Sequence, residues 1–506
     1  MPTTTIASLP YDVWARIVSF IPKDIVRKLY AVNQVLFHIA MEERYKSAYI
    51  HDVKIPLIRD WIHRLSAPCR ASKIRDLHLR PSPLGHHISK VSQKNLQSLM
   101  GKIKHTPADS LVRKLLEPFT WPVTTSGERR EAILSLLQIV TGLSEVKTLR
   151  VELSGPHSLE SFRMTTPLIN IAWKACSSVL RTVYFDFPLD VMKCVLPSNL
   201  HLPNLEEFSV RFSIKYRTTD SEEVIITNLL PFVNNHHLTL QKLTLFTRGR
   251  CHLAPFFRQL SRMPRLTSFS LTQGYISTLQ TDTSGLHRFL TVHAGTLTSL
   301  KLVFQALGKP YVKDPLVGEW FEQPCLEVAL PYLRTLEFRL WRFPSSFSTL
   351  LGTYLKQYNH SLTSLIIHNL QPLTYQDLKN IVIGFGVSGV LRCLEVDVST
   401  VPCKIFDLLS INLPGLHALN LTTDGFVTTE DVPFYPDMTM DLYFNCWLHE
   451  FRNEMRPLSY PAWDLRHLTL RFNNQSAYRR RFCLTAILKT LPGVQTLNGM
   501  PRRSFF

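Results

Sequence analysis

The chain has 506 residues, of which 45% are hydrophobic and 19% are charged. This balance excludes an intrinsically disordered chain, because disordered chains lack the apolar residues that a packed core needs. Lysine and arginine outnumber aspartate and glutamate by 57 to 39, which gives a net charge of +18. A charge of this size excludes a neutral surface and raises the question of an acidic partner.

Residues 9–45 carry apolar side chains at helical spacing. A first helix is predicted by the spacing of Val13, Ile17, Phe20 and Ile21, and Pro22 ends it. Asp24 can cap a second helix and Asn33 a third. The second has its apolar stripe at Ile25, Leu29 and Val32, and the third at Leu36, Phe37, Ala40 and Met41. Three helices in so short a segment bury too little surface alone, so we expect this module to contact a partner or the rest of the chain.

Residues 46–140 form a basic connector with candidate helices. The segment contains sixteen basic and seven acidic residues, a net charge of +9, whereas residues 1–45 carry only +1. Half of the excess charge of the chain therefore lies in this connector.

One short phrase, with apolar residues at positions 1, 4 and 6, recurs along residues 141–506. Its twelve copies begin at Val146, Leu180, Leu205, Leu240, Leu266, Leu297, Leu333, Leu362, Leu391, Leu416, Leu465 and Val494, and the last of them breaks off at position 6, where Gly499 stands. An outlying copy begins within the connector at Ile74, so a first degenerate repeat is expected near residues 74–80. The copies are about 32 residues apart on average, which is the upper end of leucine-rich repeat spacing. Alternating apolar positions predict one short strand for each copy.

The stretches between the phrases are predicted to be helices that end at Pro or Gly just before the next strand, as in Asp407–Gly415. One strand and one helix per unit predict an α/β fold, a leucine-rich-repeat solenoid or horseshoe, in which stacking of units buries the core. The alternative is a conventional parallel α/β sheet, which rarely repeats one phrase a dozen times.

The longest interval contains an acidic insertion, residues 424–464. It has eight acidic residues and only Arg452 and Arg456 as basic ones, a net charge of −6. Its aromatic residues are compatible with a plain solvated loop or with a folded flap that supports binding. Basic runs at 479–481 and 502–503 follow, and guanidinium groups there could bind an acidic or phosphorylated partner.

The motifs of catalysis are not found, so we expect no enzymatic activity and no cofactor. No two of the nine cysteines are closer than ten residues, so no zinc-type cysteine pair exists, and we expect no metal site. Residues 384–389 spell Gly-x-Gly-x-x-Gly, but they follow a predicted helix and precede a strand, the reverse of a dinucleotide site. We therefore interpret these glycines as the end of a helix.

Residues 9–37 resemble an F-box on the following matches: Leu9-Pro10, Asp12-Val13, Ile17, Ile21-Pro22, Asp24-Ile25, Leu29, Val32-Asn33 and Phe37. The usual pattern has Glu where Asp12 stands, Leu where Ile21 stands, and commonly Trp where Phe37 stands. It also has a Ser-Lys type pair where this chain has Asn33-Gln34. The resemblance implies a small all-α three-helix F-box at 1–45, ahead of the repeats.

A chain with an F-box before leucine-rich repeats resembles the substrate receptors of Skp-cullin-F-box ubiquitin ligases. The resemblance implies that the module binds the Skp adaptor subunit and, through it, a cullin. The residues that would contact Skp at matching positions are Leu9, Pro10, Val13, Ile17, Ile21, Leu29 and Val32. The same residues could instead form the core of the module, and for Ile17, Leu29 and Val32 both interpretations stay open.

The function implied is that of a non-catalytic adaptor whose repeats bind an unidentified protein substrate, either acidic or phosphorylated, for ubiquitination. The alternative is a protein-interaction scaffold that is not linked to ubiquitination. Binding of nucleic acid is not expected, because no recognition helix or RNA-binding signature accompanies the charge. No membrane contact is expected, and the absence of an apolar leader predicts a location in the cytoplasm or nucleus.

Overall fold

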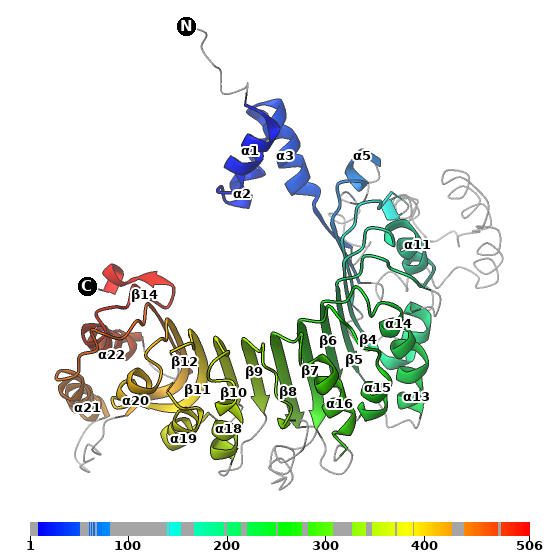
Figure 1. The fold of residues 1–506 in the computed structure, drawn as a ribbon. Helices are drawn as coiled ribbons and strands as arrows, with labels where there is room; N and C mark the ends of the chain where they lie inside the picture. Colours follow the sequence, from blue (N-terminus) through cyan, green and yellow to red (C-terminus); the bar gives the residue numbers. More distant parts are fainter. Residues whose placement is uncertain are drawn as a thin grey trace, which may run out of the picture. The chain divides into compact units, whose positions relative to one another are not determined.

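The structure is a computed structural model of the chain (Figure 1). It describes residues 9–50, 60, 62, 64–65, 68–80, 139–140, 142–152, 166–196, 200–213, 220–248, 251–275, 282–306, 326–340, 347–369, 372–387, 389–427, 440–473 and 477–505. The chain divides into two compact units, Met1–Lys242 and Leu243–Phe506. Most of the predicted connector and residues 428–439 of the acidic insertion lie outside the described residues.

The strands follow one another in chain order in a 15-stranded sheet. The first unit contains β1 (Ser47–Ile50), β2 (Asp76–Leu79), β3 (Thr148–Glu152), β4 (Thr182–Pro188) and β5 (Glu207–Ser213). From the unit boundary onward follow β6 (Lys242–Arg248), β7 (Ser268–Tyr275), β8 (Ser299–Ala306), β9 (Thr335–Leu340), β10 (Ser364–Asn369), β11 (Cys393–Pro402), β12 (Ala418–Val427), β13 (His467–Phe472), β14 (Thr496–Leu497) and β15 (Met500–Pro501). The pairs with a described register are parallel, except that β14 and β15 are antiparallel.

All thirteen copies of the phrase lie on strands, and each strand begins at position 3 of its copy. Neighbouring copies pair position for position, as Ser364 with Cys393 and Leu365 with Leu394 on β10 and β11. The apolar positions therefore stack in rows across the sheet. The predicted α/β class is confirmed as a long, open, parallel sheet with helices, and this arrangement is consistent with a repeat solenoid.

Strand β1 was not predicted from the sequence. It pairs in parallel with β2, with Ser47 opposite Asp76, so it occupies the place of one more repeat. Tyr45, Ala48 and Ile50 stand at its positions 1, 4 and 6, and all three are buried. The leucine pattern misses this copy because a tyrosine, an alanine and an isoleucine fill the apolar positions. The repeat array therefore begins directly after the helical segment, inside the predicted connector.

Helices lie on one face of the sheet in each unit (Figure 1). The first unit has α5 (Pro68–Ala71), α11 (Thr166–Cys176), η4 (Leu189–Val191), α12 (Met192–Val195), α13 (Asp220–Val224), η5 (Ile225–Leu229) and α14 (Leu230–Asn235). The second has α15 (Ala254–Gln259), α16 (Ser284–His293), α18 (Phe347–Lys356), α19 (Tyr375–Phe385), α20 (Ile405–Asn412), α21 (Met440–Met455), α22 (Ala477–Thr490) and η7 (Arg502–Phe505). In the described part of the chain, no helix has the length and apolar character to span a membrane.

The head, residues 9–45, consists of α1 (Tyr11–Val18), α2 (Lys23–Val26), η2 (Leu29–Ala31) and α3 (Gln34–Tyr45). Asn33 caps α3 as predicted, because its side chain accepts a hydrogen bond of 2.8 Å from the backbone N–H of Leu36. The predicted cap at Asp24 is wrong. Helix α2 has only four residues and begins after Pro22, so Asp24 lies within its first turn.

The glycines of residues 384–389 end a helix, as interpreted from the sequence. Helix α19 stops at Phe385, and Gly386 follows with a φ of 84°, which favours glycine. Gly384 has a packing role, because a Cβ there would lie 2.8 Å from the Cα of Gly352 on α18. Two glycines thus allow α18 and α19 to approach closely.

The acidic insertion is a folded element over residues 440–464. Helix α21 buries Leu448, Phe451 and Met455, and Trp463 is buried beyond its end. The interpretation as a plain solvated loop is therefore wrong for these residues, because the apolar side chains at helical spacing drive the segment onto its neighbours.

Two histidines are buried at equivalent places, four residues before a phrase. His236 Nε2 accepts a hydrogen bond of 2.9 Å from the backbone N–H of Leu202, and His293 Nε2 accepts one of 3.0 Å from that of Met263. On each ring, Nδ1 lies 2.6 to 2.7 Å from a backbone carbonyl of the preceding helical turn. Each imidazole is therefore held neutral, and burial lowers the pKa of both histidines.

We expect the free energy of unfolding to fall as the pH drops below 6.5. In the unfolded chain both imidazoles take up protons in that range, whereas the folded chain resists protonation, so stability is present above pH 6.5 and lost below it. The loss can reach about 1.4 kcal/mol per pH unit for each histidine. Urea unfolding of the chain and of the His236→Gln/His293→Gln variant between pH 7.5 and 5.5 measures this. The free energy of unfolding of this double variant should depend less on pH. The control His38→Gln, which changes an exposed histidine, should keep the pH dependence of the unsubstituted chain.

Candidate protein-binding surfaces

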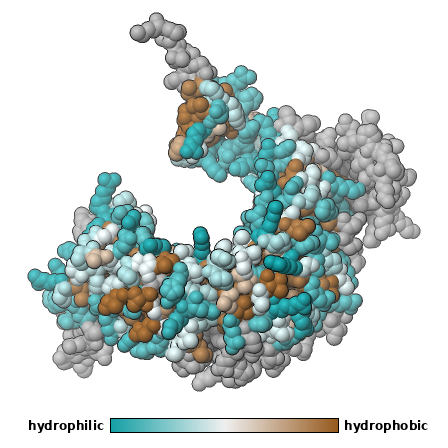
Figure 2. Space-filling view, viewed as in Figure 1, coloured by the Kyte–Doolittle hydropathy of each residue, from teal (hydrophilic) through white to brown (hydrophobic). Residues whose placement is uncertain are grey.

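The head exposes large apolar side chains around a small core. We call the following residues the head surface, each of them more than a third exposed: Leu9, Val13, Ile17, Phe20, Ile25, Tyr30, Val32 and Phe37. Figure 2 shows hydrophobic residues gathered on the head. Exposed apolar patches of this kind mark interaction sites, since a monomeric protein gains nothing from keeping them in water.

Helix α1 has apolar residues on two faces, and the structure separates them. Trp14 and Val18 point into the head core, together with Val26, Leu36 and Ile39, while Val13 and Ile17 stay exposed. The sequence spacing predicts Val13 and Ile17 on the apolar side of this helix, whereas the structure buries Trp14 and Val18. A helix that is apolar on both sides needs tertiary contacts to decide which face is inside.

The seven residues predicted to contact Skp fall into two groups. Five of them are exposed: Leu9, Pro10, Val13, Ile17 and Val32. The other two, Ile21 and Leu29, are half-buried and pack against the head core. The head surface also includes four residues that the sequence did not single out for contact, Phe20, Ile25, Tyr30 and Phe37.

Polar contacts fix the helices that carry the head surface. The Tyr11 hydroxyl donates a hydrogen bond of 3.0 Å to Glu42, which connects α1 to α3, and Lys23 lies 3.5 Å from Glu43, which connects α2 to α3. Partial burial, together with the Glu42 carboxylate, raises the pKa of Tyr11. The hydroxyl therefore stays protonated and keeps donating.

The uncovered face of the strands, formed by positions 5 and 7 of the phrase, carries a basic cluster in the first unit. The cluster comprises His78, Arg80, Arg150 and Glu152. Glu152 accepts hydrogen bonds of 3.1 Å from Arg80 and 2.6 Å from Arg150, and His78 Nε2 lies 3.2 Å from it. Two guanidinium groups share one carboxylate, so the cluster keeps a positive charge.

Aromatic rings support the basic cluster. The guanidinium of Arg150 lies 4.2 Å from the ring centre of Tyr184, and that of Arg80 lies 5.7 Å from Tyr49. Burial would raise the pKa of Glu152, but the hydrogen bonds from the two arginines outweigh it and lower this pKa. Burial, together with the nearby arginines, lowers the pKa of His78 and outweighs the opposing effect of the Glu152 carboxylate. Near neutral pH the cluster therefore consists of a neutral imidazole, one carboxylate and two cations.

The same face in the second unit has a different chemistry. Here His368 lies between two carboxylates, with Nδ1 3.1 Å from Asp397 and Nε2 3.7 Å from Glu395. Arg471 lies 3.5 Å from Glu395, and Asn420 donates to the same carboxylate. Among the described residues, no group of three or more His, Cys, Asp or Glu side chains is arranged to hold a metal ion.

A scan against protein-family models and a search of curated proteins both find no match for the chain.

Proposed function

We propose that the chain is a non-catalytic substrate-recognition adaptor of a Skp-cullin-F-box ubiquitin ligase. In this proposal the head is a three-helix F-box that binds the Skp subunit through the head surface, and the strands and helices behind it are leucine-rich repeats that bind a protein substrate. The ligase would act by raising the effective concentration of a ubiquitin-conjugating enzyme at that substrate, so this chain needs no bond chemistry of its own.

One observation carries the proposal. Five residues at F-box positions that would contact Skp, including Ile17 and Val32, are exposed around a core made by other residues. If these side chains served only the core of the head, they would be buried. Their exposure supports an apolar interface with a partner protein.

The basic cluster suggests what part of the substrate the first unit would bind. Arg80 and Arg150 have side chains that are 38% and 48% exposed, and both belong to a cluster with excess positive charge. Guanidinium groups pair bidentately with carboxylate and phosphate groups. We therefore propose an acidic or phosphorylated segment of a cytoplasmic or nuclear protein as the substrate.

Affinity purification of the tagged full chain, followed by identification of the co-purifying proteins, tests the proposal. A Skp subunit and a cullin are expected among them. Their absence, with the head surface intact, would contradict the proposal.

The half-life of a captured protein separates a ligase receptor from a scaffold. We expect the Ile17→Asp/Val32→Asp variant to bind that protein as before but to lengthen its half-life severalfold in cells, because the ligase no longer reaches it. Cycloheximide chase measures the half-life. An unchanged half-life would leave the chain as an interaction scaffold without a role in ubiquitination.

A further inference from the structure

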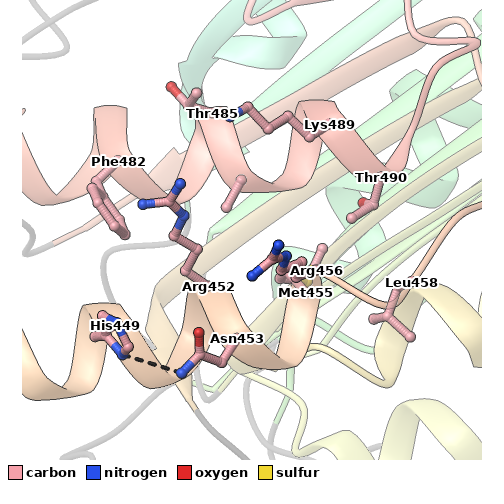
Figure 3. Close-up of a pocket in the computed structure, with 11 residues that line it drawn as sticks. His449, Arg452, Asn453, Met455, Arg456, Leu458, Phe482, Thr485, Lys489 and Thr490 are labelled. Carbon is pink, nitrogen blue, oxygen red and sulfur yellow. Dashed lines mark hydrogen bonds between the residues drawn. The ribbon is translucent and has the colours of Figure 1, made fainter.

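A cavity of about 780 Å³ lies between helices α21 and α22 in the second unit (Figure 3). Cavities of roughly 300–1,000 Å³ are the size that small-molecule ligands occupy. Helix α21 contributes Arg452 to the lining, Arg456 follows directly after its end, and α22 contributes Phe482 and Lys489. The cavity belongs to the second unit, and nothing in the proposed function uses it.

The charged groups in the lining are all cationic at neutral pH. They are Arg452, Arg456 and Lys489, and the eleven residues that line the cavity include no carboxylate. In the described part of the chain, none of the three is paired with an aspartate or glutamate. The cavity therefore collects unpaired positive charge.

Two of these cations come from a segment that is otherwise acidic. The insertion 424–464 contains eight acidic residues and two basic ones, and both basic residues line the cavity. Arg452 lies in the last turn of α21 and Arg456 directly follows its last residue, so the two arginines are one turn apart, and like charges at that spacing repel each other. Lys489 adds a third charge from the facing helix. Such an arrangement becomes favourable when a multivalent anion binds between the helices.

We propose that this cavity binds a small organic molecule that carries two or more phosphate groups. Arginine side chains bind phosphate oxygens in bidentate fashion, and lysine contributes a compact charge. Three cations match an anion with several charges better than they match a single carboxylate. Phe482, Met455 and Leu458 supply apolar surface in the lining for the organic part of the ligand, and Phe482 presents an aromatic ring.

Isothermal titration of the full chain with ATP and with inorganic tripolyphosphate tests the assignment. Both probes should bind, and ATP should bind more tightly because its base can contact the Phe482 ring. Arg452→Gln and Lys489→Gln should each weaken both probes by about tenfold or more, since each removes a charge-assisted hydrogen bond. Phe482→Ala should abolish the advantage of ATP over tripolyphosphate.

Matched controls remove the same charges from helices outside the cavity. Arg288→Gln on α16 and Lys356→Gln in the last turn of α18 are exposed and should leave both affinities unchanged. Thermal unfolding without ligand verifies that each variant is folded. If neither probe binds, if the controls weaken binding as much as the cavity variants, or if tripolyphosphate binds as tightly as ATP, the proposal is wrong.

Discussion

The Ile17→Asp/Val32→Asp variant should lose detectable capture of the Skp adaptor while keeping its unfolding temperature. Ile17 and Val32 are 39% and 62% exposed, so the carboxylates remain solvated in the free chain and cost little stability. In an apolar interface the same carboxylates would be desolvated without partners, which costs several kcal/mol for each group. Pull-down of purified Skp by the immobilised full chain measures the effect.

A matched control introduces two aspartates at exposed apolar positions outside the head. Val387 and Ile411, in the second unit, are 67% and 69% exposed, and the Val387→Asp/Ile411→Asp variant adds the same two charges outside the head. It should capture Skp as the unsubstituted chain does. Equal capture by both double variants would show that the head surface is not the interface, whereas equal loss would indicate a nonspecific effect of charge.

The sequence was a good guide to the strands. Thirteen copies of one phrase predicted thirteen strands, because side chains that alternate between two faces leave a pattern that does not depend on distant contacts. Strand β1 escaped prediction because Ala48 stands where a large apolar residue is usual. Its assignment depends on its pairing with β2, which the local sequence does not contain.

The head was predictable in its helices but not in its surface. The cap at Asn33 is a local signal, and it was found. The division of α1 into an inner face with Trp14 and an outer face with Ile17 depends on where α3 packs. The sequence therefore admits both interpretations, contact or core, for Ile17, Leu29 and Val32. In the structure Leu29 is half-buried, and Ile17 and Val32 are exposed.

The basic cavity shows the limit of counting charges along the chain. A net charge of −6 over residues 424–464 indicates an acidic segment, yet its two arginines line the same cavity as Lys489 from another helix. Residues far apart in the sequence meet there because α21 and α22 pack together. Only the tertiary structure brings the three cations to one place.

Phe185→Ala should lower the free energy of unfolding by about 3–5 kcal/mol, the range for removal of a buried phenylalanine. Phe185 is fully buried at position 6 of its phrase, and its ring lies 5.7 Å from Trp173 and 6.1 Å from Phe208. The substitution leaves a cavity between strand and helix and removes contacts to the neighbouring repeat, whose stability depends on such contacts. Denaturant unfolding measures the loss.

Phe20→Ala is the matched control, since it removes the same ring from a residue that is 75% exposed. It should change the free energy of unfolding by no more than about 0.5 kcal/mol, as for other surface substitutions. It should nevertheless weaken Skp capture, because Phe20 belongs to the head surface. A large loss of stability in Phe20→Ala would mean that the exposed ring of Phe20 contributes to folding. That result would contradict its assignment to a surface that binds a partner.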